Sequence, residues 1–186
     1  VDEVQRKGFV IVETAIEFET LIDKIEPALS SIRPAKPDDL ETILDITKEC
    51  YIEHDRFYNR FRNEEFFTLD QAWEYYKNSV VNNFNDENCL NVVVEDAQGV
   101  CAYYILKKVG DLDYYTKYKG IIAGVTKRAV GRDLHIEMQR KLTEMIGQPY
   151  ITNNRTQLGN YRVVRNHLRE HRQLCKIEHI CYLKKS

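Results

Sequence analysis

The sequence predicts a mixed α/β protein with a mostly antiparallel central sheet flanked by helices. Segments rich in β-branched and aromatic residues, separated by short turns, occupy the middle of the chain. Amphipathic stretches with helical spacing precede and follow them. The 186 residues, 43% hydrophobic and 30% charged, suit one domain with a sizeable core.

The N-terminal part predicts two strands and two helices. Residues 8–14 (GFVIVET) read as a strand, and residues 15–25 as a short amphipathic helix. Residues 32–35 form a short strand. A helix then begins near Pro37, with carboxylates in its first turn.

The rest of the chain predicts a meander followed by crossover helices. Residues 54–63 interleave arginines with aromatics and lack periodicity, so they read as a loop or broken helix. Further strands are expected at 90–95, 100–109, 114–125, 150–152 and 174–183, and further helices at 69–80, 131–146 and 160–170.

Composition narrows the class of protein. The net charge of -2 argues against a protein devoted to holding nucleic acid. No apolar run approaches the ~20 residues of a membrane span, and no signal segment opens the chain. The five cysteines are odd in number and form no CxxC pair, which favours free thiols and a cytoplasmic location. The start at Val1 suggests that an upstream portion is missing.

Three motifs follow one another along the chain. The first is Ile-Arg-Pro-Ala followed by Asp38-Asp39. The second, from Arg128 to Gly131, sits between a long strand and a helix. The third is Asn160 and the helix after it. Together they resemble the GNAT superfamily of acyl-CoA N-acyltransferases, whose opening strand and helix are similar to the first motif. The resemblance covers 31–186 and implies a GNAT domain at 30–186, preceded by an N-terminal extension at 1–29 that belongs to an acceptor-side subdomain.

The second motif has the chemistry of an anion site. A loop that turns directly into a helix presents free N–H groups and the positive end of the helix dipole. The resemblance implies that it holds the pyrophosphate of acetyl-CoA, although Asp133 stands where the pattern has Gly or Ala. The expected cofactor-binding residues are Val125, Thr126, Lys127, Arg128, Val130, Gly131, Arg132 and Asn160.

The third motif carries the acid. The family commonly has Tyr seven residues after the Asn, to protonate the leaving CoA thiolate. This chain has His167 there, either as the acid or as a packed side chain, and Tyr118 is the other candidate. Asn160 is either a cofactor ligand or a helix N-cap. The base is left open between water and the turn aspartates Asp111 and Asp113.

Finer features resemble the branch that includes TDP-fucosamine acetyltransferase. They are the Gly-Phe strand upstream of Ile32 and the Thr-Gln-Leu-Gly-Asn segment that ends at Asn160. The branch implies a nucleotide-activated amino sugar as acceptor and a role in polysaccharide biosynthesis. Cations for its pyrophosphate and aromatics for its base would come from Arg56, Tyr58, Arg60 and Arg62. The other interpretation is a charged cover over the core.

Several alternatives remain open. The acceptor could be another small amine or a protein amine, or the chain could be a degenerate fold that binds without catalysis. His171, Cys175, His179 and Cys181 are zinc-type ligands, but three share a strand face with Ile177 and Leu183. That face reads as a packed core side, so no metal is expected. Both a monomer and a homodimer stay open.

Overall fold

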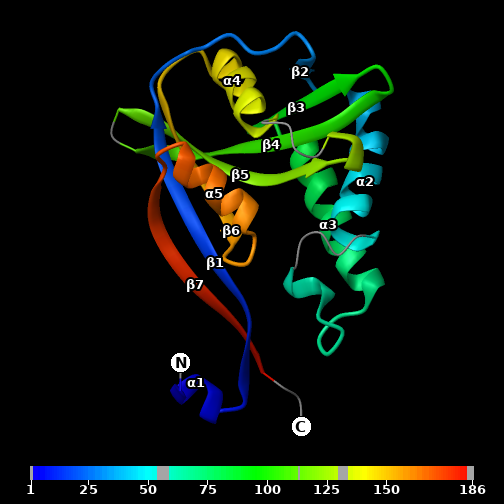
Figure 1. Ribbon diagram of the computed structural model, residues 1–186, viewed down its shortest axis with the longest axis vertical. Coiled ribbons are helices and arrows are strands. Elements are labelled where there is room, and N and C mark those ends of the chain that lie inside the picture. Colours follow the sequence, from blue (N-terminus) through cyan, green and yellow to red (C-terminus); the bar gives the residue numbers. More distant parts are fainter. Residues whose placement is uncertain (1, 54–58, 113, 130–133, 184–186) are drawn as a thin grey trace.

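The computed structural model describes residues 2–53, 59–112, 114–129 and 134–183. Its centre is one seven-stranded sheet in the order β2-β3-β4-β5-β6-β1-β7 (Figure 1). The strands are β1 (Phe9–Ile22), β2 (Ile32–Pro34), β3 (Cys89–Asp96), β4 (Gly99–Leu112), β5 (Tyr115–Val125), β6 (Tyr150–Gln157) and β7 (Gln173–Leu183). Every neighbouring pair is antiparallel except β5 and β6, which are parallel. The predicted mixed, mostly antiparallel sheet is confirmed.

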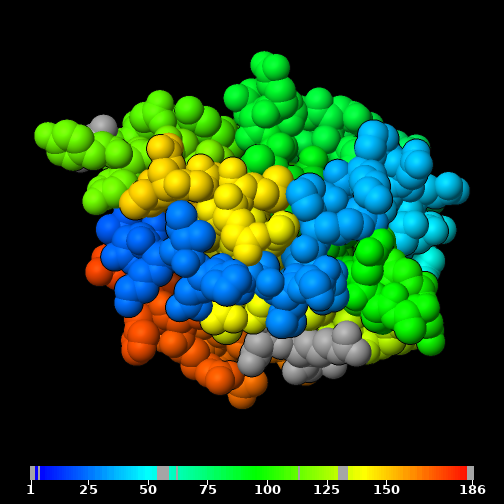
Figure 2. All heavy atoms as spheres, turned by 90° about the horizontal axis from the view of Figure 1, so that it is seen from above, coloured from blue at the N-terminus to red at the C-terminus, as the bar shows by residue number. Residues whose placement is uncertain are grey.

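Helices cover the sheet on both faces. The covering helices are α2 (Leu40–Lys48), α3 (Leu69–Phe84), α4 (Leu134–Ile146) and α5 (Tyr161–Arg169), whereas the short helix α1 (Asp2–Arg6) lies beyond the start of β1 (Figure 1). Short helical turns lie at Pro37–Asp39, Glu49–Glu53, Arg60–Arg62 and Lys127–Ala129. Helices α2 and α3 lie on one side of the sheet and α4 and α5 on the other (Figure 1). Figure 2 shows the segment that follows β1 running along α4, where the backbone N–H of Ala28 donates to Glu144.

Two buried clusters form the core, one on each face of the sheet. On the α4 face, Tyr104 and Tyr150 pack with Leu142, which has the helical spacing expected from the sequence. On the other face, Tyr103 of β4 packs against Ile43 and Ile46 of α2. Apolar residues recurring every three or four positions explain why both helices dock through one side.

Ion pairs between charged side chains hold the strand β2 and the start of α2 together. The guanidinium of Arg33 in β2 donates to Asp39 at 2.7 and 2.9 Å and to Glu95 of β3 at 2.5 Å. Asp39 also accepts from the backbone N–H of Lys36 at 2.6 Å. The hydrogen bonds from Arg33 lower the pKa of Asp39. Arg33 and Asp39 of this motif therefore fix the start of α2 against the sheet.

One predicted element is wrong. Residues 15–25 were expected to form a helix, but β1 continues as a strand to Ile22. It pairs with β6 on one side and β7 on the other, and Phe18 faces the core while Glu17 and Glu19 lie on the opposite face. Ladder hydrogen bonds on both edges override a weak helical pattern. Residues 9–22 of the predicted N-terminal extension are thus an interior strand of this sheet.

Candidate functional site

The parallel strands β5 and β6 separate from one another halfway along. Their ladder runs from Thr116 opposite Tyr150 to Lys119 opposite Asn153 and ends there. Strand β5 then continues to Val125 alongside β4, and β6 continues to Gln157 alongside β1. The backbone N–H and C=O groups of β5 beyond Lys119 are therefore not paired with β6. On this stretch the Ala123 carbonyl accepts from the Tyr51 hydroxyl at 2.7 Å, and the Val125 nitrogen lies 3.3 Å from the Cys50 sulfur.

A bulge marks the point of separation. Leu106 of β4 lies opposite Gly120, but Ile105 lies opposite Ile122, so Ile121 is an extra residue in β5. A bulge leaves a residue out of the ladder and increases the local twist, and bulges are frequent beside active sites.

A hydrogen bond crosses β5 at the same level. The hydroxyl of Tyr104 in β4 donates to the side-chain carbonyl of Asn154 in β6, passing over Gly120. A Cβ at Gly120 would lie 2.3 Å from Asn154 Oδ1 and 2.5 Å from the Tyr104 hydroxyl. Glycine is therefore required here for close approach, not for a turn. We call the gap that opens between β5 and β6 beyond Lys119 and Asn153 the splayed region. This hydrogen bond closes its narrow end.

The predicted phosphate loop lies at the wide end, and only part of it falls in the described residues. Val125 is held by Cys50, whose sulfur lies 3.3 Å from the Val125 nitrogen. Thr126 is buried, and its N–H donates to Cys101. The Lys127 side chain is exposed. Val130, Gly131, Arg132 and Asp133 lie outside the described residues.

Arg128 is occupied by protein groups. Its guanidinium donates to Asp96 at 2.9 Å and to the carbonyls of Gly99 and Val100 at 3.2 and 2.9 Å. These contacts fasten the turn between β3 and β4 to the end of β5. The expected contact of Arg128 with a phosphate stays a prediction, and it would compete with three existing bonds.

Asn160 caps helix α5. Its side-chain oxygen accepts from the backbone N–H of Val163 at 3.4 Å. The helix-cap interpretation of this residue is confirmed, whereas its role with a cofactor stays a prediction.

His167 is a buried neutral imidazole. The residue is 2% exposed, and its ring centroid lies 4.8 Å from that of Phe18 and 5.6 Å from that of His135. Burial, with the nearby charge of Arg172, lowers the pKa of His167 to about 3. Its Nδ1 has no hydrogen-bond partner among the described residues. At neutral pH the ring can donate a hydrogen bond, but it carries no extra proton to release.

Buried polar groups surround this histidine. Arg172 donates to Glu170 at 2.7 Å, and Glu170 Oε1 lies 3.3 Å from His135 Nδ1 in the first turn of α4. Although burial alone would raise it, the hydrogen bond and charge of His135 bring the pKa of Glu170 down to about 2. The network ties the end of α5 to the start of α4.

The other candidate acid and base are placed differently. Tyr118 precedes the separation, with its ring 5.4 Å from that of Tyr150, and burial raises its pKa. Asp111 lies at the β4–β5 hairpin, 3.6 Å from Lys108, at the opposite end of β5 from the wide end of the splayed region. Asp113 is outside the described residues.

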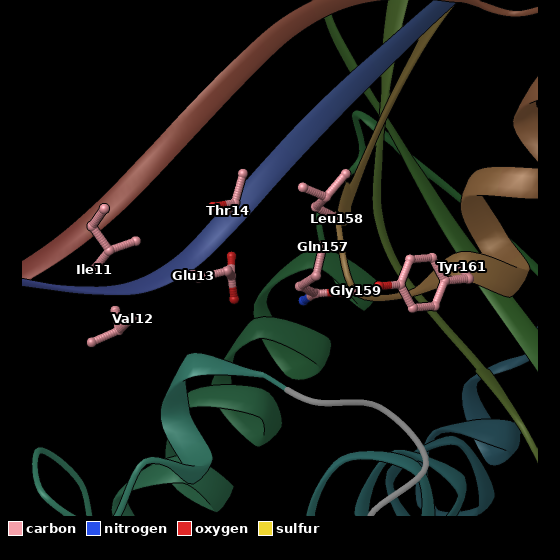
Figure 3. Close-up of a pocket in the computed structure, with 8 residues that line it drawn as sticks. All are labelled: Ile11, Val12, Glu13, Thr14, Gln157, Leu158, Gly159 and Tyr161. Atoms are coloured by element: carbon pink, nitrogen blue, oxygen red, sulfur yellow. The ribbon is translucent and has the colours of Figure 1, made fainter. Parts of the chain in front are cut away.

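A pocket of about 320 Å³ opens beside the end of β6. Its lining residues are Ile11, Val12, Glu13, Thr14, Gln157, Leu158, Gly159 and Tyr161. Figure 3 shows the polar ends of Glu13, Gln157 and Tyr161 turned toward this space. The Glu13 carboxylate is buried. It accepts one hydrogen bond from Arg60 Nη1 at 3.2 Å and one from the backbone N–H of Arg60 at 3.3 Å.

The structure therefore brings Arg60, one predicted acceptor residue, beside a carboxylate that sequence reasoning missed. The expectation of a helix from Ala15 onward hid the sheet pairing that places Glu13 here. Alternation of Glu13, Glu17 and Glu19 on one face was the available signal. Arg56, Tyr58 and the Arg62 side chain are outside the described residues.

The interpretation of β7 as a packed core side is wrong. Ile177 and Leu183 are 58% and 55% exposed, because β7 is an edge strand whose outer side no helix covers in the described structure. Among the described residues, no cluster of three or more metal-ligating side chains could hold a metal ion. No described helix is long and apolar enough to cross a membrane.

Comparison with known proteins defines the fold class. No protein-family model matches the sequence, and no curated protein matches it. The solved structures that resemble it include GNAT-family acetyltransferases, and the predicted GNAT-like fold is confirmed.

Three similar structures illustrate the likeness. A functionally unknown conserved protein from Staphylococcus epidermidis has a TM-score of 0.67 at 11% identity over 99% of this chain and 66% of its own. A GCN5-related N-acetyltransferase from Anabaena variabilis has 0.62 at 8% identity, over 100% and 44%. Saccharomyces cerevisiae N-myristoyltransferase with bound myristoyl-CoA has 0.50 at 11%, over 78% and 42%. The chain spans less than two thirds of the length of each.

Proposed function

We propose that the chain is an acyl-CoA-dependent N-acetyltransferase that moves acetyl from acetyl-CoA to a primary amine. The separation of β5 from β6 after Lys119 and Asn153 carries this proposal. Beyond that point β5 has no β6 beside it, and the amide groups of the pantetheine arm would pair with the β5 backbone around the Ile121 bulge. The fold shared with acyl-CoA enzymes supports the same placement.

The chain's own groups fit amide-bond formation. The amine attacks the thioester carbonyl, a C–N bond forms, the C–S bond breaks and a proton passes to the CoA thiolate. A backbone N–H at the Ile121 bulge would polarise the carbonyl, since preorganised donors stabilise a developing oxyanion. His167 is neutral at physiological pH, so its role would be an N–H hydrogen bond to the cofactor and not the release of a proton. Tyr118 keeps its phenolic proton and is the remaining candidate acid.

The predicted phosphate loop completes this proposal. Lys127 is exposed at the wide end of the splayed region and would meet the pyrophosphate. Asn160 caps α5 at the same end of the sheet, and Val125 and Thr126 lead into the loop. Val130, Gly131 and Arg132 belong to it by sequence.

The nature of the acceptor rests on the sequence. A nucleotide-activated amino sugar is the acceptor implied by the resemblance to the TDP-fucosamine branch, with the segment that holds Arg60 as its binding side. Another small amine or a protein amine is the competing acceptor. A protein that binds without turnover is the second candidate function, favoured by the low pKa of His167. A homodimer would have the open edge of β7 available for pairing.

A two-stage experiment tests the proposal. Calorimetry with acetyl-CoA comes first, followed by mass spectrometry of products formed from a TDP-linked 4-amino sugar, an aminoglycoside and a lysine peptide. An acetylated product, with release of free CoA, supports the enzyme and identifies its acceptor class. Acetyl-CoA binding without any product supports the non-catalytic alternative. Absence of acetyl-CoA binding to folded protein refutes both.

A further inference from the structure

The pocket beside β6 has the composition of a cation site. Among the described residues that line it, Glu13 alone is charged. Ile11, Val12 and Leu158 supply apolar walls, and Tyr161, 78% exposed, stands at the rim. A volume of about 320 Å³ lies at the small end of ligand sites, which suits a short amine or the tip of a larger molecule.

Glu13 is buried, and its carboxylate accepts fewer hydrogen bonds from the described residues than it could. Its side chain is 5% exposed, and in the described part of the chain both hydrogen bonds to it come from Arg60. An ionised carboxylate accepts about four hydrogen bonds, and a buried charge is costly unless it is fully paired. The bonds to Arg60 are long for charge-assisted bonds, at 3.2 and 3.3 Å. A second cation at this carboxylate would therefore be stabilised.

The position of the pocket links it to acyl transfer. Gln157 is the last residue of β6, so the pocket lies at the end of β6 toward which the splayed region widens. Strand β1, which lines the pocket, pairs with β6 on the side opposite β5. Resting on the proposed function, we infer that this pocket receives the primary ammonium group of the acceptor, with Glu13 as its anionic partner and Arg60 as a positioning residue that shares the carboxylate.

The inference separates the two ends of a nucleotide-linked acceptor. A carboxylate-lined pocket repels a phosphate, so the amino end enters while the pyrophosphate stays outside. A free amine and an amino sugar would present the same ammonium group to Glu13.

Binding of simple matched probes tests the inference without turnover. We expect n-butylamine to bind the wild-type protein by calorimetry, and its isosteres n-butanol and butyrate to bind more weakly or not at all. Glu13→Gln should weaken n-butylamine binding about 10-fold or more. Arg60→Gln should strengthen it, because the carboxylate loses its internal cation. Glu17→Gln is the matched control, since Glu17 lies on the same face of β1 but pairs with Lys119 at 3.6 Å outside the pocket.

The outcomes separate this site from the acyl-CoA site. Circular dichroism confirms that each variant is folded, and acetyl-CoA affinity should be equal in all of them. Unchanged n-butylamine affinity in Glu13→Gln, preferred binding of butyrate, or no binding of n-butylamine by wild type would overturn the inference. If Glu13→Gln does not fold, the Arg60→Gln result decides alone, and weaker binding there overturns it. Loss of acetyl-CoA binding in wild type would instead refute the proposed function.

Discussion

Replacing Gly120 with alanine should damage the closed end of the splayed region. The added Cβ would stand 2.3 Å from Asn154 Oδ1, 2.5 Å from the Tyr104 hydroxyl and 3.3 Å from Tyr104 Cε2. The two oxygens are the partners of the hydrogen bond that crosses β5. Both residues are more than 90% buried, so neither side chain can swing into solvent. The methyl group must therefore separate the two polar groups.

The cost follows from two contributions. A buried polar group that loses its partner costs about 1–3 kcal/mol, and overpacking a well-filled region costs about 1–3 kcal/mol. We expect Gly120→Ala to lower the free energy of unfolding by about 3 kcal/mol in total. For a chain of this length that corresponds to a fall in Tm of about 10 °C.

Urea unfolding and thermal melting measure the change, with a double-mutant cycle to assign it. In the Tyr104→Phe/Asn154→Ala background both oxygens are absent, so adding Gly120→Ala should cost much less. Gly159→Ala is the matched control for stability, because a Cβ there meets no atom within 4 Å. A Gly120→Ala protein as stable as wild type, or an equal cost in both backgrounds, would refute the reasoning.

Three further predictions concern pH, the opening motif and the phosphate loop. The pKa of His167 lies near 3 in the folded protein, below its unfolded value. The stability that this group contributes is therefore fully present above about pH 6.5 and is lost as the pH drops toward 3. Urea unfolding should show about 2 kcal/mol lost between pH 7 and 5, and His167→Phe should remove most of that pH dependence. Asp39→Asn should lower stability by about 1–3 kcal/mol in the same assay, since Arg33 is left half-buried without its main partner; a neutral effect would contradict the role assigned to that ion pair. Lys127→Ala should weaken acetyl-CoA binding several-fold, and more so at low salt. Arg128→Ala should leave the affinity within about 3-fold of wild type, because that side chain already donates to Asp96 and two carbonyls. The reverse order of effects would show that Arg128 leaves those bonds to hold the phosphate.

Local patterns predicted most of the fold. The amphipathic spacing around Ile43 and Leu142 and the turns around Gly99 predicted α2, α4 and the β3–β4 hairpin, and all three are present. These features depend on short-range periodicity and turn chemistry, which a single sequence carries.

Long-range pairing could not be predicted in the same way. The insertion of β1 between β6 and β7 joins segments more than a hundred residues apart, and its strand state depends on those neighbours. The candidate site could not be predicted for the same reason, because it depends on long-range strand pairing. Glu13 reaches the pocket only because β1 is an interior strand, and the burial that neutralises His167 comes partly from Phe18 on the same strand.

Hydrogen exchange with and without acetyl-CoA tests the central claim most directly. If the pantetheine arm pairs with β5 where it leaves β6, amides within residues 120–125 should exchange more slowly in the complex, together with the start of α5. Exchange of the amides of β2, at the opposite edge of the sheet, and of α3, which packs on β3 and β4, should be unaffected. Binding without protection of residues 120–125, or no binding to folded protein, would contradict the assignment of this splayed region as the acyl-CoA site.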